Sequence, residues 1–164
     1  MKAKEKDWCD AAARLAQRLH KGQTDKAGAD YFESHLTTVA GMGETWLERV
    51  AGYLHDAAED TPNSVGEVLS MLENEGGNPL PTAERQTLAT ALHLLNHHNA
   101  PDRESYIRGI AQNPLATAVK LHDLSHNMDL SRLPNPTPKD LNRLERYKYE
   151  YAYLQDNGVP NSFP

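Results

Sequence analysis

The sequence predicts an all-α protein, folded as one compact bundle of about seven to eight helices. The composition favours helix, because 20 Leu and 19 Ala stand against two Ile and six Val. The 164 residues suit one domain, which we place at 1–157, with 158–164 as a carboxyl-terminal tail. Apolar residues recur at helical spacing in nearly every segment between turn signals.

The amino-terminal half is predicted to hold three helical segments. The first carries an apolar stripe from Trp8 and stops near Gly22. A polar loop follows, and then a short helical segment starts at His35. The third stripe, over 47–58, ends before Pro62, because the residue before a proline is disfavoured in the α region.

Further helices are predicted along the rest of the chain. Ser64 with Glu67, and Thr137 with Asp140, have the spacing of a capping box, in which the side chain of each residue accepts a hydrogen bond from the backbone N–H of the other. The predicted helices are 64–73, 82–97, 102–111, 114–130 and 137–154.

Charge and cysteine content exclude several classes of protein. The net charge of −6 offers no general attraction to nucleic acid. A single cysteine, Cys9, cannot form an internal disulfide. The charged amino terminus is followed by no apolar signal core, and no run approaches the ~18 residues of a membrane span. We therefore expect a cytoplasmic protein that binds neither nucleic acid nor membrane.

The segment HDAAED is the densest polar cluster on an otherwise apolar stripe. It places His55, Asp56, Glu59 and Asp60 on adjacent strips of one predicted helix. Three neighbouring carboxylates repel one another, and the helix dipole disfavours acids at a carboxyl end. The cluster therefore indicates a site in which a cation or a proton relieves the charge, in preference to a solvated acidic helix end.

A second acid lies where an apolar residue is expected. Asp123 and Asn127 follow Ala116 and Val119 at helical spacing. A buried acid needs a partner. Lys120 is one candidate, and a metal ion shared with the HDAAED segment is the other.

Three phrases carry a resemblance to a known family. They are LHKGQTDKAGADYFESHLTTVA from Leu19, LHDAAEDT from Leu54 and KLHDLSHNM from Lys120. They resemble the HD superfamily of metal-dependent phosphohydrolases, and within it the hydrolase domain of the RelA/SpoT-homologue family. The likeness is strongest to the small, metazoan SpoT-like alarmone hydrolases. It covers most of the chain between His20 and Tyr151.

The resemblance implies a metal site and a reaction. The implied metal ligands are His35, His55, Asp56 and Asp123, and the implied catalytic pair that orients and deprotonates water is Glu59 and Asp60. Two imidazoles and two carboxylates with positions left for water favour Mn²⁺ or a similar six-coordinate ion over closed tetrahedral zinc. We expect Mn²⁺, with Fe²⁺, Co²⁺ or Zn²⁺ as alternatives.

The resemblance also implies the contacts of a small-molecule nucleotide. Lys26 matches the basic loop residue of the family, and Asn127 its nucleotide-contacting asparagine. Arg143 and Tyr147, one turn apart, match a pair that reaches the phosphates and the sugar, although arginine and tyrosine at this spacing are also a common surface pair. The implied activity is removal of the 3′-pyrophosphate from guanosine 3′,5′-bis(diphosphate), without synthesis of that nucleotide; a homodimer is left open.

The sequence departs from the family pattern in the loop and around the first histidine. Asp25 replaces an arginine, Leu36 replaces a proline, Leu124 replaces an arginine, and one extra residue separates Tyr31 from His35. Fewer cations predict a weaker hold on a bis-pyrophosphate. Two alternatives therefore stay open: an HD-type nucleotidase or phosphatase on another nucleotide, and a non-catalytic nucleotide-binding or antitoxin-like module.

The remaining histidines are predicted to be structural or exposed. His20 is expected to cap the first helix and His126 to border the site. His93 and His97 have the spacing of a zinc pair but lack a third ligand in the same phrase. His98 and His122 carry no motif.

Overall fold

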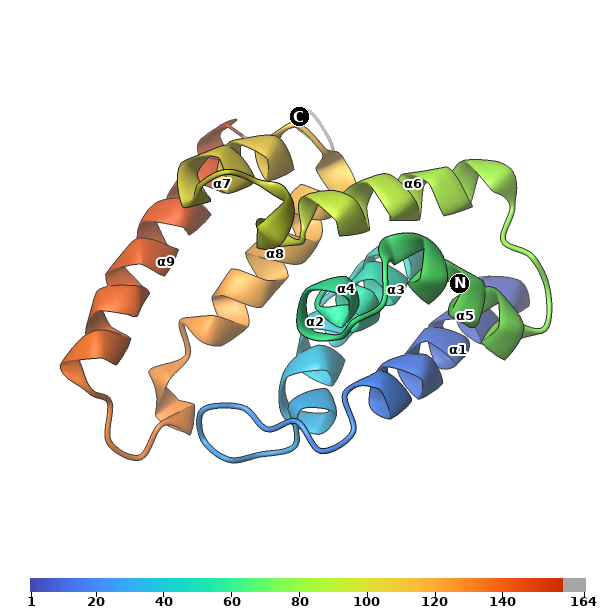
Figure 1. The fold of residues 1–164 in the computed structure, drawn as a ribbon. Coiled ribbons are helices and arrows are strands. Elements are labelled where there is room, and N and C mark those ends of the chain that lie inside the picture. Colours follow the sequence, from blue (N-terminus) through green and yellow to red (C-terminus); the bar gives the residue numbers. More distant parts are fainter. Residues whose placement is uncertain (158–164) are drawn as a thin grey trace.

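The computed structural model describes residues 1–157, and every regular element within them is helical (Figure 1). The predicted all-α class is confirmed. The predicted tail, 158–164, lies outside the described residues. The helices are α1 (Ala3–Leu19), α2 (Thr37–Gly41), α3 (Trp46–Leu54), α4 (Ala57–Asp60), α5 (Val65–Gly76), α6 (Thr82–Leu94), α7 (Arg103–Ala111), α8 (Pro114–Asn127) and α9 (Pro138–Asn157).

One apolar core holds these helices together. Helix α1 packs on α3 and α5, whereas α8 contacts α2, α3, α6, α7 and α9. Figure 1 shows α8 between α9 and the amino-terminal helices, with α7 beside the upper ends of α8 and α9. Of the leucines in the predicted stripes, Leu15 and Leu54 are buried, whereas Leu19, Leu47 and Leu130 are half-buried. Other leucines complete the core, among them Leu69, Leu88, Leu124 and Leu154. Because α8 touches most of the bundle, a polar residue on its inner face lies close to several other elements.

Several predicted boundaries are wrong. Helix α1 begins five residues before Trp8, α6 stops at Leu94, and α8 stops at Asn127. The predicted helix over 47–58 is interrupted at His55 and Asp56, which end α3 and begin α4. Asp56 has φ −97° and ψ −2°, in the sparsely populated bridge region where active-site residues often lie.

The predicted capping boxes are confirmed at the starts of α5 and α9. Ser64 Oγ accepts from the Glu67 backbone N–H at 3.1 Å, and Glu67 accepts from the Ser64 N–H at 3.2 Å. The Thr137 and Asp140 side chains make the same reciprocal pair.

We expect Ser64→Ala to lower the free energy of unfolding by about 1 kcal/mol, since the Glu67 backbone N–H at the start of α5 loses its acceptor. Urea denaturation checks this, with Ser70→Ala, in the interior of the same helix, as the control; equal losses in the two variants would contradict it.

The extra residue between Tyr31 and His35 is accommodated by a π-helical turn, Phe32–Leu36. The Thr37 backbone N–H donates to the Phe32 carbonyl, five residues back. A π turn takes up one residue more than an α turn, and such turns occur mostly at functional sites. The rings of Tyr31 and His35 consequently stay together, with centroids 5.2 Å apart.

No described helix has both the length and the apolar character that a membrane-spanning helix needs.

Candidate active site

Four side chains from separate elements converge inside the bundle. His35 comes from the π turn, His55 and Asp56 from the break between α3 and α4, and Asp123 from the middle of α8. His35 Nε2 lies 3.1 Å from Asp123 Oδ1 and 3.8 Å from Asp56 Oδ2. His55 Nε2 lies 3.1 Å from Asp56 Oδ2 and 3.7 Å from Asp123 Oδ1. All four residues are less than 9% exposed.

The hydrogen bonds of the two imidazoles orient their ring nitrogens. His55 Nδ1 lies 2.7 Å from the Gly52 carbonyl oxygen, which can only accept, so this nitrogen carries the proton. His55 Nε2 therefore faces the carboxylates, and this buried nitrogen makes no hydrogen bond among the described residues. His35 Nδ1 lies 2.8 Å from His126 Nδ1, which leaves His35 Nε2 directed at the same point.

The negative charges of the cluster favour the binding of a cation. Burial lowers the pKa of His55, but Asp56 and Asp123 raise it by more than burial lowers it, so this pKa lies well above its usual range. Burial raises the pKa of Asp123, but Lys120 and the two imidazoles outweigh it, so that pKa lies well below its usual range. The carboxylates are thus held as anions, and positive charge must reach them as a proton on an imidazole or as a metal ion.

Asp123 is also held from outside the cluster. Lys120 Nζ lies 2.7 Å from Asp123 Oδ2, and both residues are buried. Asn127 Nδ2 donates to Asp123 Oδ1 at 2.9 Å. The sequence offered Lys120 and a shared metal as alternative partners of this acid. The structure shows that one oxygen of Asp123 pairs with Lys120 while the other faces His35 and His55.

Tyr31 holds the second carboxylate. Its hydroxyl donates to Asp56 Oδ2 at 2.5 Å. Burial, together with the nearby Asp56, raises the pKa of Tyr31 above its usual range, so the phenol remains a donor. His20 lies behind this ring, with centroids 5.6 Å apart, and is the carboxyl-terminal cap residue of α1, as predicted. Unlike an exposed cap, it is completely buried.

Glu59 and Asp60 lie on α4, the single turn that follows Asp56. One carboxylate oxygen of each of Asp56, Glu59 and Asp60 lies within 4.8 Å of the others. Burial and then the charges of Asp56 and Glu59 raise the pKa of Asp60 to about 6. The structure therefore places the predicted catalytic pair directly beside the predicted metal ligands.

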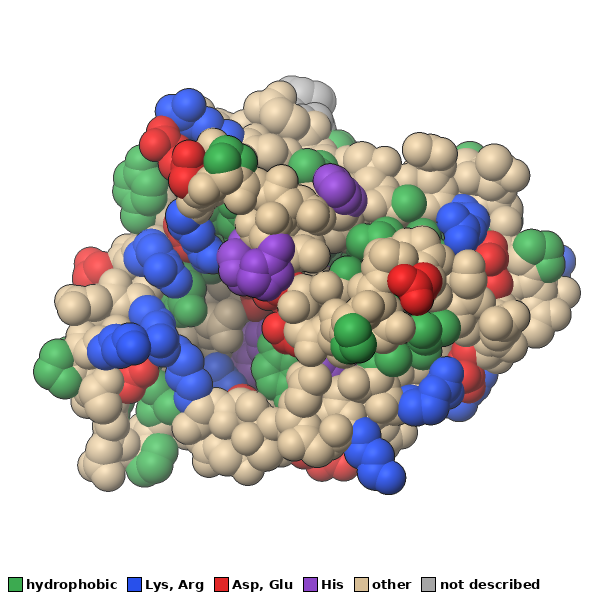
Figure 2. Space-filling view, in the orientation of Figure 1, with side chains coloured by type: hydrophobic (Ala, Val, Ile, Leu, Met, Phe, Trp, Pro, Cys, Tyr) green, Lys and Arg blue, Asp and Glu red, His purple; other side chains and the backbone are tan. Residues whose placement is uncertain are grey.

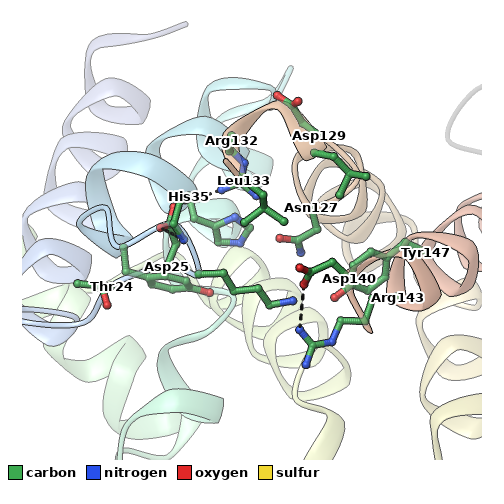
Figure 3. A pocket seen from close by; sticks show the side chains of 14 residues that line it. Thr24, Asp25, His35, Asn127, Asp129, Arg132, Leu133, Asp140, Arg143 and Tyr147 are labelled. Atoms are coloured by element: carbon green, nitrogen blue, oxygen red, sulfur yellow. Dashed lines mark hydrogen bonds and ion pairs between the residues drawn. The ribbon is translucent and has the colours of Figure 1, made fainter. Parts of the chain in front are cut away.

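A cavity of about 240 Å³ opens next to His35. Its walls include all four predicted substrate contacts, Lys26, Asn127, Arg143 and Tyr147. Figure 3 shows His35 on one side and Arg143 and Tyr147, from α9, on the other. In Figure 2, Lys and Arg side chains gather over α9 around a hollow in which acidic and histidine side chains are visible. Arg143 and Tyr147 thus face the cavity together.

Asp25, which replaces an expected arginine, organises the loop that carries Lys26. Its carboxylate accepts from the Ala27 and Ala29 backbone N–H groups, both at 2.9 Å, and from the Ser34 hydroxyl at 2.7 Å. Arg132 Nη1 lies 3.3 Å from the same carboxylate and Arg132 Nη2 donates to the His126 carbonyl. Arg132, which carries no motif, thereby brings a further cation to the cavity wall.

Sequence reasoning missed the residues that support the site. The sequence did not predict that Arg132 contacts the loop, that His126 contacts His35, or that Tyr31 contacts Asp56. His97, predicted to be structural or exposed, contacts Glu59. Helix α6 ends before His97, so His93 and His97 do not form a helical zinc pair. Only the position of His126 beside Asn127 in the sequence offered a signal.

The donor set fits a divalent metal ion. Ligands bound about 2.1 Å from one ion lie roughly 3 to 3.5 Å apart, close to the separations between the imidazole nitrogens and carboxylate oxygens here. The unpartnered His55 Nε2 supports the same conclusion. Two nitrogens and two oxygens are a borderline set that suits Mn²⁺, Fe²⁺, Co²⁺ or Zn²⁺.

Comparisons with known proteins found two similar enzymes. No family model matches the chain. Over 136 residues, 75% of the chain, it is 27% identical to a GTP pyrophosphokinase of Streptomyces coelicolor and to one of Streptomyces antibioticus. The chain covers only 14% and 15% of the length of these two relatives. The similarity supports a relationship to the RelA/SpoT-homologue family.

Proposed function

We propose that the protein is a metal-dependent phosphohydrolase of a nucleotide and that guanosine 3′,5′-bis(diphosphate), cleaved at its 3′-pyrophosphate, is the best candidate substrate. One observation carries the proposal. His35, His55, Asp56 and Asp123 converge within the bundle, next to a second acidic group and a cavity lined by cations.

The four convergent residues would hold the metal ion, with Mn²⁺ as the first candidate. When bound, such an ion supplies Lewis acidity toward a phosphoryl oxygen and makes water more acidic. Tyr31, His126 and Lys120 keep the ligand atoms oriented through their bonds to Asp56, His35 and Asp123. Partners of this kind commonly tune metal affinity and ligand geometry.

Glu59 and Asp60 would handle the attacking water. One oxygen of each carboxylate lies within 4.8 Å of the other, close enough for both to accept hydrogen bonds from one water molecule. A carboxylate in this position orients the water and takes its proton as the bond to phosphorus forms. The bond between that phosphorus and the ribose 3′-oxygen breaks. The 3′-oxygen takes a proton and leaves as the hydroxyl of GDP, while the surrounding cations stabilise the negative charge of the pyrophosphate product.

The cavity would bind the rest of the nucleotide. Lys26 and Arg143 supply positive charge for phosphate oxygens, and Tyr147 offers an aromatic face with a hydroxyl. Asn127 reaches the cavity while it donates to Asp123, so it links bound substrate to the metal ligands. The named relatives are GTP pyrophosphokinases, which supports a guanosine nucleotide as the substrate class.

A nucleotidase acting on a monophosphate is a second candidate function. The observation that favours it is the charge of the cavity wall, where Asp25, Asp129 and Asp140 stand against the three cations Lys26, Arg132 and Arg143. A wall with so little net charge suits a ligand with few phosphates better than a bis-pyrophosphate.

A substrate panel tests the proposal. The protein is incubated with Mn²⁺ and, separately, guanosine 3′,5′-bis(diphosphate), GTP together with ATP, GDP and deoxynucleoside monophosphates, and the products are resolved by anion exchange. We expect pyrophosphate and GDP from the first substrate. Orthophosphate from monophosphates alone would favour the nucleotidase, and pyrophosphate transfer from ATP to GTP would show synthesis. Tight binding without any product would indicate a non-catalytic module.

Lys26→Ala is expected to raise KM about tenfold with little change in kcat, because a charged hydrogen bond to bound phosphate is lost equally in the ground and transition states. Steady-state kinetics on the substrate found by the panel measures both constants. Lys21→Ala is the control, since Lys21 lies in the same loop but does not line the cavity. A change confined to kcat would contradict this role for Lys26.

A further inference from the structure

We infer that His97 is a positioning residue for the reaction: it holds one oxygen of Glu59 so that the other is presented to the attacking water. This inference rests on the proposed function and names a residue that the family resemblance does not include. It concerns the contact between α4 and the turn that follows α6.

Two groups of His97 contact the same oxygen. The backbone N–H of His97 donates to Glu59 Oε1 at 3.0 Å, and the ring nitrogen Nδ1 contacts Oε1 as well. The Glu59 side chain is 18% exposed, whereas that of His97 is 48% exposed. Among the described residues, no hydrogen bond to Oε2 of Glu59 occurs, so this oxygen keeps its accepting capacity for water.

Glu59 needs such support because of the helix that carries it. Helix α4 has only four residues, Ala57–Asp60, and begins at the break that sets Asp56 in the metal cluster. A glutamate side chain has three rotatable bonds, and nothing in one helical turn restricts its carboxylate. A contact from a distant segment is therefore required to hold the carboxylate beside Asp56 and Asp60.

The turn that carries His97 is itself braced. Asn96 Oδ1 accepts from the His98 backbone N–H at 3.1 Å, and Asn99 Nδ2 donates to the His93 carbonyl at 3.0 Å. Tyr106 of α7 donates its hydroxyl to the Leu95 carbonyl at 3.0 Å. The His97 ring also lies edge-on to the Tyr106 ring. These contacts give His97 a defined position from which to orient Glu59.

A kinetic double-mutant cycle tests the inference. We expect His97→Ala to lower kcat by about 10- to 100-fold while KM and bound metal stay unchanged, since the retained backbone donor alone leaves Glu59 mobile. In a Glu59→Gln background, His97→Ala should have no further effect on kcat. His97→Gln, which keeps a side-chain donor, should recover part of the loss.

His93→Ala is the matched control, because His93 is exposed and its side chain makes no hydrogen bond to Glu59 among the described residues, whereas the His98 ring packs on that of His97 with centroids 4.0 Å apart. Its kcat should stay within about twofold of the wild type. The inference is overturned if His97→Ala leaves kcat intact, or lowers it equally with and without Glu59. If the wild-type protein cleaves no nucleotide, both the proposed function and this inference fail. If the wild-type protein is active and His97→Ala has no effect, only this inference fails.

Discussion

Replacing Asp56 by asparagine is expected to abolish metal binding and to lower turnover by about a thousandfold or more. Asp56 Oδ2 is the atom that faces both imidazoles, at 3.1 Å from His55 Nε2 and 3.8 Å from His35 Nε2. Asparagine removes an anionic donor and presents either a neutral oxygen or an amide N–H at this point, so the charge that attracts the ion is lost. Elemental analysis of the purified protein and single-turnover kinetics measure the two effects.

Glu59→Gln separates metal binding from catalysis. It should keep the metal content of the wild type, since Glu59 lies outside the group formed by His35, His55 and Asp123, and lose about 10²- to 10⁴-fold in kcat, the usual contribution of a general base. Full metal content in Asp56→Asn, or undiminished turnover in Glu59→Gln, would falsify the assignment of these roles. Chelation of the wild-type protein should reproduce the Asp56→Asn phenotype, and added Mn²⁺ should reverse it only in the wild type.

Lys120→Met is expected to lower the stability of the metal-free protein by about 3 to 5 kcal/mol. Lys120 and Asp123 are buried together, with Nζ and Oδ2 2.7 Å apart. Methionine fills a similar volume but leaves the Asp123 carboxylate facing Asp56 without its cation. Urea unfolding of apo-protein, prepared with a chelator, measures the loss.

Two further comparisons test whether the loss of stability comes from the unpaired Asp123 carboxylate. Lys120→Met combined with Asp123→Asn should be more stable than Lys120→Met alone, because the uncompensated buried charge is then removed. Mn²⁺ should raise the melting temperature of Lys120→Met by more than it raises that of the wild type, since an ion that binds only the folded state replaces the missing positive charge. A single variant as stable as the wild type would contradict the importance of this pair.

The sequence was most informative where local rules apply. Ser64 and Thr137 begin helices as their capping boxes predict, and Leu15 and Leu54 of the apolar stripes lie in the core. It was least informative about where helices are interrupted. The apolar spacing runs on through His55 and Asp56 and therefore does not predict that α3 ends there. At this break Asp56 accepts a hydrogen bond from Tyr31, 25 positions away.

The pairing of distant residues was also outside the reach of periodicity. His126 was predicted to border the site, but its bond to His35 joins positions 91 apart in the chain. The bond between His97 and Glu59 spans 38 positions. Such contacts require that α2, α6 and α8 be packed together first, and the packing is a property of the whole core.

By itself, the sequence determined the helical class and the main helix starts, because composition and caps are local properties. It supplied the candidate metal ligands only through a resemblance to a known family. Only the tertiary structure decided which atom of each side chain faces the centre and which neighbour holds it there. Lys120 pairs with one oxygen of Asp123, and the other oxygen faces the imidazoles. Asp25, at a position where an arginine was expected, accepts hydrogen bonds that stabilise its own loop. These assignments follow from burial and long-range hydrogen bonding, which a linear pattern of residues does not specify.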